Sequence, residues 1–171
     1  NVVYRLVDSL KVKNILEAGC GEGFVIQYLL SKNPNLNITG LDFSGSAIEF
    51  AKKINPKAVF FQDDIYNLNF AKNQFDLVMS LEVLEHLEYP QKALGKLAKI
   101  SAEYILISVP NEPWFSLANF LRGKNIKRIG QDPQHLNYWS KKNIIDLVSQ
   151  YFKIIKVKTP FPWVVILAVE K

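Results

Sequence analysis

Apolar residues recur along this chain in two alternating patterns, short continuous runs and longer stretches with helical spacing. The short runs predict buried strands, and apolar residues three or four positions apart predict amphipathic helices. The predicted strands cover 14–18, 36–42, 58–61, 104–110, 152–159 and 163–170, and a further buried strand opens the stretch 74–87. The predicted helices cover 1–10, 23–32, 46–54, 141–150 and a segment that starts at Pro90. Strands that are apolar on both faces and separated by helices indicate a parallel sheet covered on both sides.

This alternation is broken between residues 111 and 137. An aromatic amphipathic stretch comes first and a basic stretch follows it, Arg122 to Arg128. The segment follows the carboxyl end of a strand, where open α/β sheets bind ligands. We therefore interpret 111–137 as an insertion that covers the substrate side. Two alternatives are a helix that covers the sheet edge and a basic amphipathic element that rests on a membrane surface.

A glycine-rich turn joins the first strand to the second helix. The strand ends in an acid, Glu17, and Gly19, Gly21 and Gly23 follow at alternate positions. Glycine adopts positive φ without strain and lets a ligand approach the backbone closely. The helix that follows directs free N–H groups into the same space. The turn therefore predicts a ligand site, although an ordinary strand-to-helix turn would use the same residues.

The second strand also ends in an acid, Asp42. It lies roughly 20 residues beyond the glycine turn, the distance at which nucleotide-binding folds place a ribose-binding carboxylate. Phe43 is then positioned to lie against an adenine ring. The alternative is that Asp42 or Ser44 only caps the next helix and that Phe43 belongs to the core.

Four ordered stretches resemble the motifs of the class I S-adenosylmethionine (SAM)-dependent methyltransferases. The first is Glu17-x-Gly19-x-Gly21-x-Gly23, and the acid at 42 follows it. Residues 62–68 resemble the third motif, in which Asp64 would contact the adenine amine and the backbone of Ile65 would bind the ring. Asp63 is the alternative acid. The fourth stretch, 74–87, resembles the small-molecule branch of these enzymes, which includes the ubiquinone-pathway O-methyltransferases.

The resemblance implies SAM as the cofactor and a Rossmann-like three-layer α/β sandwich. Its sheet would be mostly parallel and seven-stranded, in the order 3-2-1-4-5-7-6, with an antiparallel hairpin at the C-terminus. We expect a single methyltransferase domain over residues 1–171 that includes the insertion. The expected cofactor-binding residues are Glu17, Gly19, Gly21, Gly23, Asp42, Phe43, Asp64, Ile65 and Ser80. The glycine spacing disfavours a nucleotide-dependent dehydrogenase.

Methyl transfer to a hydroxyl also requires a base, and histidine often performs this role. The chain has two histidines, His86 and His135, and both follow the predicted methyl-donor site, so we consider them the catalytic candidates. Glu82, Glu85 and His86 have the spacing that places side chains on one side of a helical turn. With His135 they resemble the metal site of small-RNA 3′-terminal 2′-O-methyltransferases. A divalent cation bound there would lower the pKa of a substrate hydroxyl.

Composition narrows the choice of acceptor only slightly. The net charge of +5 is modest and the lysines are spread along the chain, which favours a role in surface solubility. An acidic substrate, RNA or an anionic membrane surface is the functional alternative, and the basic residues favour RNA only weakly. The single cysteine, Cys20, excludes an internal disulfide and is typical of a reducing compartment. No signal peptide is evident, and the longest apolar run, 163–169, is too short to cross a bilayer. We therefore expect a cytoplasmic protein.

The most favoured function is SAM-dependent methylation of a small-molecule hydroxyl. An RNA 2′-hydroxyl is the alternative acceptor, with the Glu82, Glu85, His86 and His135 set as a metal-assisted site. A non-catalytic SAM-binding partner domain is a further alternative. The intact acids Glu17, Asp42 and Asp64 argue against that alternative.

Overall fold

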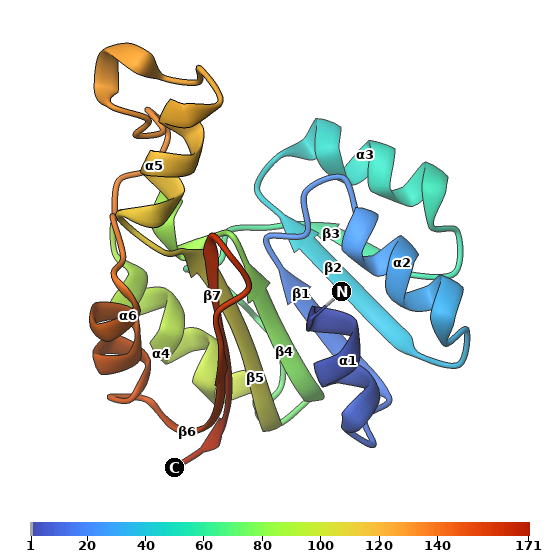
Figure 1. Ribbon diagram of the computed structural model, residues 1–171. Helices are drawn as coiled ribbons and strands as arrows, with labels where there is room; N and C mark the ends of the chain where they lie inside the picture. Colours follow the sequence, from blue (N-terminus) through green and yellow to red (C-terminus); the bar gives the residue numbers. More distant parts are fainter. Residues whose placement is uncertain (1) are drawn as a thin grey trace.

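In the computed structural model, which describes residues 2–171, the chain folds into a seven-stranded sheet with helices on both faces (Figure 1). The strands are β1 (Asn14–Ala18), β2 (Asn37–Asp42), β3 (Val59–Gln62), β4 (Phe75–Leu81), β5 (Ser101–Pro110), β6 (Phe152–Lys158) and β7 (Trp163–Glu170). The α-helices are α1 (Val2–Ser9), α2 (Phe24–Lys32), α3 (Gly45–Ile54), α4 (Pro90–Ile100), α5 (Trp114–Leu121) and α6 (Lys141–Val148). Two 3₁₀ turns, η1 (Leu84–His86) and η2 (Ile126–Arg128), complete the regular structure of the described residues. The predicted first helix began at Asn1, which lies outside them.

The strand order is β3-β2-β1-β4-β5-β7-β6, as the resemblance predicted. The strands from β3 to β5 in this order pair in parallel, and β7 runs antiparallel to both β5 and β6. A crossover connection returns the chain to the same edge for each parallel pair, whereas the last two strands need only a short loop. The predicted fold class and C-terminal hairpin are confirmed.

The core consists of two apolar clusters, one on each face of the sheet. Helices α1, α2 and α3 contribute Leu6, Ile26 and Ile48 to one cluster. Helices α4 and α6 contribute Leu94 and Ile144 to the other. The central strand β4 contributes to both clusters, so the apolar residues at consecutive positions of this strand are buried on opposite faces.

The apolar run in β3 predicts a strand that is buried on both faces, and for β3 this prediction is wrong. Phe60 is buried, but Val59 and Phe61 are about half exposed. The physical reason is position, because β3 is an edge strand, and Phe61 packs there against the ring of the loop residue Phe70. The apolar run in β3 therefore does not imply burial on two sides.

Residues 113–138, which we call the arm, project from the carboxyl edge of the sheet (Figure 1). The arm contains α5 and η2, and backbone contacts close its base. The Glu112 N–H donates to the Trp139 carbonyl at 2.8 Å, and the Lys141 N–H donates to Asn111 Oδ1 at 3.2 Å. Whether the arm covers a substrate stays a prediction. Among residues 2–171, no helix has the length and apolar content to span a membrane.

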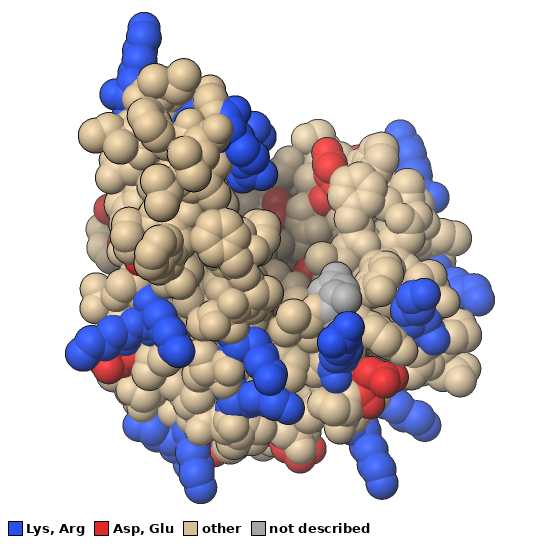
Figure 2. Space-filling view, viewed as in Figure 1, with Lys and Arg blue, Asp and Glu red and all other residues tan. Residues whose placement is uncertain are grey.

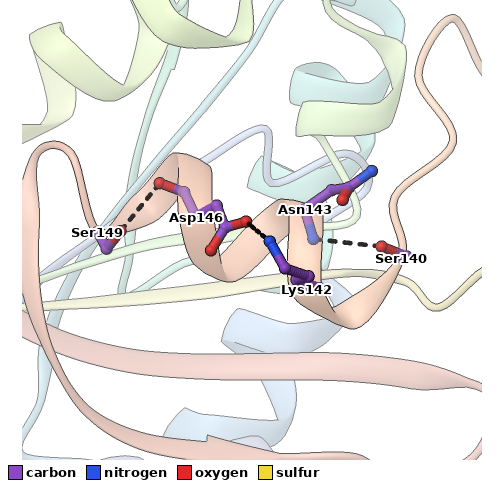
Figure 3. A network of polar contacts seen from close by, with 5 residues as sticks. All are labelled: Ser140, Lys142, Asn143, Asp146 and Ser149. Atoms are coloured by element: carbon purple, nitrogen blue, oxygen red, sulfur yellow. Dashed lines mark hydrogen bonds and ion pairs between the residues drawn. The ribbon is translucent and has the colours of Figure 1, made fainter.

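Helix α6 follows the arm, and a small network of polar contacts lies along it (Figure 3). The predicted cap is confirmed, since Ser140 Oγ accepts a hydrogen bond from the Asn143 N–H at 3.2 Å. On the exposed side Lys142 pairs with Asp146, and Ser149 Oγ donates to the Asp146 carbonyl. These contacts are local to α6, so the helix begins and ends independently of the arm.

Candidate active site

The glycine turn between β1 and α2 has the backbone that its sequence requires. Gly19, Gly21 and Gly23 all have positive φ, at 82°, 50° and 76°. The N–H groups of Gly19 and Cys20 both donate to the Leu41 carbonyl, which holds the turn against the end of β2. A Cβ on Gly19 would lie 2.3 Å from Val83 Cγ2, so the turn also packs closely against the segment after β4. The turn is therefore held between the ends of β2 and β4, the two strands on either side of β1.

Asp42 links this turn to the start of α3. Its Oδ2 accepts the Gly21 N–H and its Oδ1 accepts the Ser44 N–H, both at 2.8 Å. A carboxylate has about four acceptor positions, so each oxygen can accept one further hydrogen bond. Ser44 performs the capping role, because its Oγ accepts the Ala47 N–H. Asp42 is therefore a preorganised acceptor rather than the helix cap.

A cavity of about 570 Å³ opens beside the turn at the carboxyl edge of the sheet. Six of the expected cofactor-binding residues line it, namely Gly19, Gly21, Asp42, Phe43, Asp64 and Ile65. Phe43 is 78% exposed at this cavity, so it does not belong to the core. Figure 2 shows acidic side chains within the hollow beside the projecting arm, whereas Lys and Arg lie on the arm at its rim and on the outer surfaces. The cavity thus combines an exposed ring, carboxylates and an open backbone turn.

Three other expected cofactor residues do not line this cavity: Glu17, Gly23 and Ser80. Gly23 instead packs against α3, where its carbonyl accepts a hydrogen bond from Asn55. Ser80 is fully buried within β4 and its Oγ has no partner among the described residues. β4 is a central strand that is covered on both faces, so the Ser80 side chain is enclosed by the core instead of lying at the carboxyl edge of the sheet. The structure therefore does not bring the Ser80 side chain into the cofactor cavity.

Glu17 lies directly behind the turn and is only 2% exposed. Its Oε2 has no hydrogen-bond partner among the described residues. Burial, together with the negative charge of Asp42, raises the pKa of Glu17 to about 8. An ammonium group near the turn would provide the missing partner for this carboxylate.

The two acids after β3 both line the cavity. Asp63 accepts the Asp64 N–H at 2.8 Å, and Asp64 accepts the Tyr66 N–H at 2.9 Å. Both side chains are half-buried, so exposure does not separate them. Asp64 and Asp63 remain alternatives for the contact with a bound base.

Glu82 is not on one helical turn with Glu85 and His86, and that prediction is wrong. Glu82 has a φ of 57°, in the left-handed region, and the 3₁₀ turn begins only at Leu84. Its carboxylate points toward β5 and β7, where it accepts Ser108 Oγ–H and Trp163 Nε1–H, both at 2.6 Å. Burial raises the pKa of Glu82, and the two hydrogen bonds oppose that rise.

Glu85, His86 and His135 do come together, although His135 lies on the arm. One ligand atom of each lies within 4.8 Å of the others. His86 Nδ1 lies 3.0 Å from the Gln134 carbonyl, and the two imidazole rings are 5.0 Å apart. Glu85 is 1% exposed, and neither carboxylate oxygen has a partner among the described residues. Burial, then the charge of Glu82, raises the pKa of Glu85 to about 8.

A divalent cation is chemically suited to these three side chains. A buried carboxylate without a partner and two imidazoles are a donor set that Mn²⁺ or Zn²⁺ accepts. His135 has a lowered pKa because of burial and the neighbouring His86, which favours the neutral form that ligates metals. Glu82 does not belong to this group, so the four-residue set becomes a set of three.

A second cavity, of about 380 Å³, lies on the other side of Glu82. Its lining is mostly apolar and comes from α1, α2, β4 and β7, with Val25, Leu81 and Trp163 among its residues. Glu82 and Ser108 are the polar residues in this lining. Glu82 also lines the first cavity, so one residue borders both spaces.

Residues 16–103 match the methyltransferase domain family. The chain belongs to that family. Among curated relatives, the mitochondrial ubiquinone biosynthesis O-methyltransferase of Candida albicans is 28% identical over 124 residues, covering 67% of this chain and 38% of that protein. The malonyl-[acyl-carrier protein] O-methyltransferase 1 of Ilyobacter polytropus is 40% identical over 75 residues, covering 42% and 28%. The chain thus spans less than half the length of either relative.

Solved structures confirm the Rossmann-like methyltransferase fold. The plantazolicin methyltransferase, in complex with a triazolic desmethylPZN analog and SAH (S-adenosylhomocysteine), has a TM-score of 0.80 and 19% identity, covering 99% of this chain and 81% of that one. The magnesium protoporphyrin IX methyltransferase of Synechocystis, also with SAH, has a TM-score of 0.76 and 19% identity, covering 99% and 80%. The resemblance to SAM-dependent methyltransferases is confirmed, and SAM is the cofactor of this family.

Sequence reasoning missed several lining residues of this methyltransferase. Val83 and Leu87 line the first cavity, and Tyr66 lines it while its hydroxyl accepts the Tyr89 N–H. Tyr66 lies inside the third motif, so its position was a usable signal. Val83 lies inside the fourth motif, but its contact with Gly19 joins segments that are distant in the sequence, so the sequence did not indicate that contact.

Proposed function

We propose that this methyltransferase transfers the methyl group of SAM to a hydroxyl of a small, largely apolar acceptor. The observation that carries the proposal is the position of Glu82 between two cavities. One cavity contains the glycine turn and Asp42, and the other is apolar. A cofactor and an acceptor that occupy the two spaces would meet at this carboxylate, and positioning is the main contribution of a protein to methyl transfer.

The first cavity supports SAM through the chemistry of its lining. Asp42 retains acceptor positions for two ribose hydroxyls, and the exposed ring of Phe43 offers a stacking surface for adenine. Asp64, or Asp63, would accept from the adenine amine. Glu17, buried without a partner for Oε2, would interact with the amino group of the methionine part. These roles are proposed residue by residue from the resemblance and from the positions described above.

The reaction consumes a hydroxyl and the sulfonium of SAM. The acceptor oxygen forms a bond to the methyl carbon, and the carbon–sulfur bond breaks, so that its electron pair remains on the sulfur of SAH. The hydroxyl proton must pass to a base. His86 and His135 are the proposed bases, since His86 lines the cofactor cavity and His135 contacts it ring to ring. The lowered pKa of His135 keeps it neutral near pH 7, the form that accepts a proton.

The same imidazoles and Glu85 would hold a divalent cation, which would supply positive charge that lowers the pKa of the acceptor hydroxyl. The unpartnered, buried carboxylate of Glu85 supports this alternative. In that case the two histidines bind and orient rather than accept the proton. Metal titration separates the two roles.

An RNA 2′-hydroxyl is the second candidate acceptor. The resemblance of the Glu85, His86 and His135 group to the RNA 3′-end enzymes favours it, and the net charge of +5 is compatible with it. Binding to RNA would weaken steeply with added salt, because cations on the protein displace counterions from phosphates. A small neutral acceptor would show little dependence on salt.

The first experiment is calorimetric titration with SAH, followed by an SAH-release assay with phenols, catechols and a short RNA. We expect SAH binding by the parent chain and a loss of roughly 10- to 100-fold in affinity for Asp42→Ala, the value of hydrogen bonds to a charged group. Asp146→Ala is the matched control, because this exposed acid on α6 lies away from the cavity. No SAH binding by the folded parent chain contradicts the proposal. SAH binding with turnover only on RNA replaces the small acceptor by the second candidate.

A further inference from the structure

Helix α5 buries polar residues and exposes apolar ones, the reverse of the usual arrangement for a helix in water. Its buried residues include the polar Ser116 and Asn119, and Asn119 Nδ2 donates to the Gly130 carbonyl. Its outward side chains are Trp114, Leu117, Phe120 and Leu121, all exposed, with Leu121 at 75%. An amphipathic helix normally buries its apolar side. Packing within this chain therefore does not account for the outer face of α5.

The exposed apolar surface continues from α5 onto the rest of the arm. Ile126 and Leu136 are exposed, and Ile129 is 74% exposed. A cavity of about 440 Å³ separates α5 from the following loop, and Leu117, Phe120, Ile129 and Tyr138 are among its lining residues. Contiguous exposed apolar surface of this kind marks an interaction site in a folded protein.

Basic residues surround this apolar surface. Arg122, Lys124, Lys127 and Arg128 lie on the arm, and no acid occurs between Glu112 and Asp132. Both ion pairs found in residues 2–171 lie elsewhere, on α3 and α6. Arg122 is bonded to the end of its own helix, through the Ala118 carbonyl and Asn119 Oδ1. Figure 2 shows blue atoms beside tan ones over the projecting lobe at the upper left.

We propose that the arm docks on an anionic lipid bilayer. The apolar side chains of α5 and η2 enter the boundary between headgroups and acyl chains, and Lys124, Lys127 and Arg128 bind lipid phosphates. A second copy of this chain would bring the same positive charges to the contact. RNA would neutralise the cations but leave Leu121 and Ile129 in water. A bilayer with anionic headgroups is complementary to both parts of the surface.

Docking would take place next to the proposed acceptor cavity. Phe115 of α5 lies with its ring 6.4 Å from that of Trp163, which lines the apolar cavity. The arm and the cavity are thus parts of one continuous region at the carboxyl edge. The docking proposal does not depend on the methyl transfer, because it is tested without cofactor or acceptor.

The test is flotation of the full chain with vesicles of phosphatidylcholine alone and with roughly 30% phosphatidylglycerol, which gives the vesicles a negative surface potential. We expect binding to the anionic vesicles that weakens with salt. Changing Lys124, Lys127 and Arg128 together to Gln removes three cations and should weaken partitioning on the order of a hundredfold, about fivefold per cation. Leu121→Gln with Ile129→Gln should also release the protein. Both positions are exposed, so these changes leave the fold intact.

Matched controls change the same kinds of residue on other parts of the molecule. Lys11, Lys57 and Lys72, changed together to Gln, remove equal charge at the amino edge of the sheet. Val59→Gln with Ile155→Gln removes apolar side chains that are about half exposed on the edge strands. Equal losses for control and arm variants overturn the proposal, and so does the absence of flotation. An arm-dependent dimer in sedimentation, without vesicle binding, assigns the surface to a second copy and overturns it as well.

Discussion

The indole of Trp163 donates its N–H to Glu82, 81 residues earlier in the chain, at 2.6 Å. With Ser108 Oγ on the other carboxylate oxygen, this contact fixes Glu82 at the border of the two cavities. Both partners are on β5 and β7, strands that pair directly, so the position of Glu82 depends on the C-terminal hairpin.

Trp163→Phe tests this dependence. The change leaves one oxygen of the half-buried Glu82 carboxylate without a donor, and we expect a loss of about 1–3 kcal/mol in unfolding free energy. The acceptor KM should rise more than the Kd for SAH, since Trp163 itself lines the acceptor cavity and not the cofactor cavity. Urea unfolding, calorimetry and steady-state kinetics measure the three quantities.

Trp139→Phe is the control for that change. Its Nε1 is buried and has no hydrogen-bond partner among the described residues, so the substitution removes similar volume without breaking a hydrogen bond. If Trp139→Phe and Trp163→Phe affect the acceptor KM equally, the role given to the Glu82 contact is wrong.

The glycine turn gives a second prediction, because positions 19 and 21 require glycine for different reasons. Gly21 has a φ of 50° and open space where a Cβ would lie, whereas Gly19 has a φ of 82° and Val83 Cγ2 at 2.3 Å from that position. Gly21→Ala should lower stability by about 1–2 kcal/mol through backbone strain alone. Gly19→Ala adds overpacking and should lower it by about 2–5 kcal/mol.

A double-mutant cycle separates the two costs. Val83→Ala combined with Gly19→Ala should recover the overpacking part and leave the strain, whereas Val83→Ala should not rescue Gly21→Ala. Urea unfolding of the five variants and the parent gives the coupling. Equal coupling of both glycines to Val83 contradicts the role given to overpacking.

The sequence predicts the framework well because the framework rests on periodicity. The apolar runs of β1 and β4 and the spacing of α4 and α6 are local properties, and the order of the strands follows from the family motifs. Asp42 and Phe43 were predictable for the same reason, since one ends a strand and the other directly follows it. The site departs from prediction where the backbone departs from regular structure.

Glu82 and Ser80 illustrate that limit. The spacing of Glu82 to Glu85 suggests a helical turn, but a positive φ at Glu82 rotates its carboxylate toward Trp163. Nothing in the local sequence indicates that conformation, because its stabilising partners lie on β5 and β7. Ser80 differs from prediction for another reason: it lies within the regular strand β4, and its burial depends on the layers that cover that strand.

Glu17 predicts a dependence of stability on pH. Its pKa is about 8 in the folded chain and about 4.3 in an unfolded one, so the folded state binds the additional proton between these values. Stability from this group is complete below the lower value and is lost as the pH rises through about 8. Glu17→Gln lacks the titration, so its stability relative to the parent should increase by a few kcal/mol, as an order of magnitude, between pH 5 and pH 8.

Urea unfolding at several pH values, without cofactor, measures this difference. Asp146→Asn on the exposed surface is the control and should follow the parent at every pH. Parallel stability curves for the parent and Glu17→Gln mean that Glu17 is ionised in the fold at neutral pH.

The metal hypothesis gives the last prediction, because the structure reduces the proposed ligand set from four residues to three. Glu85→Gln and His135→Asn should each weaken the binding of Mn²⁺ in calorimetry by at least about tenfold, since each removes a donor atom from the group within 4.8 Å. Glu82→Gln should leave Mn²⁺ affinity within about twofold, because the Glu82 carboxylate binds Ser108 and Trp163 instead. A loss for Glu82→Gln that equals the loss for Glu85→Gln restores the four-residue site. If the folded parent binds neither Mn²⁺ nor Zn²⁺, the buried Glu85 and its histidines form a proton-transfer group, and His135→Asn should then lower kcat without any effect of EDTA.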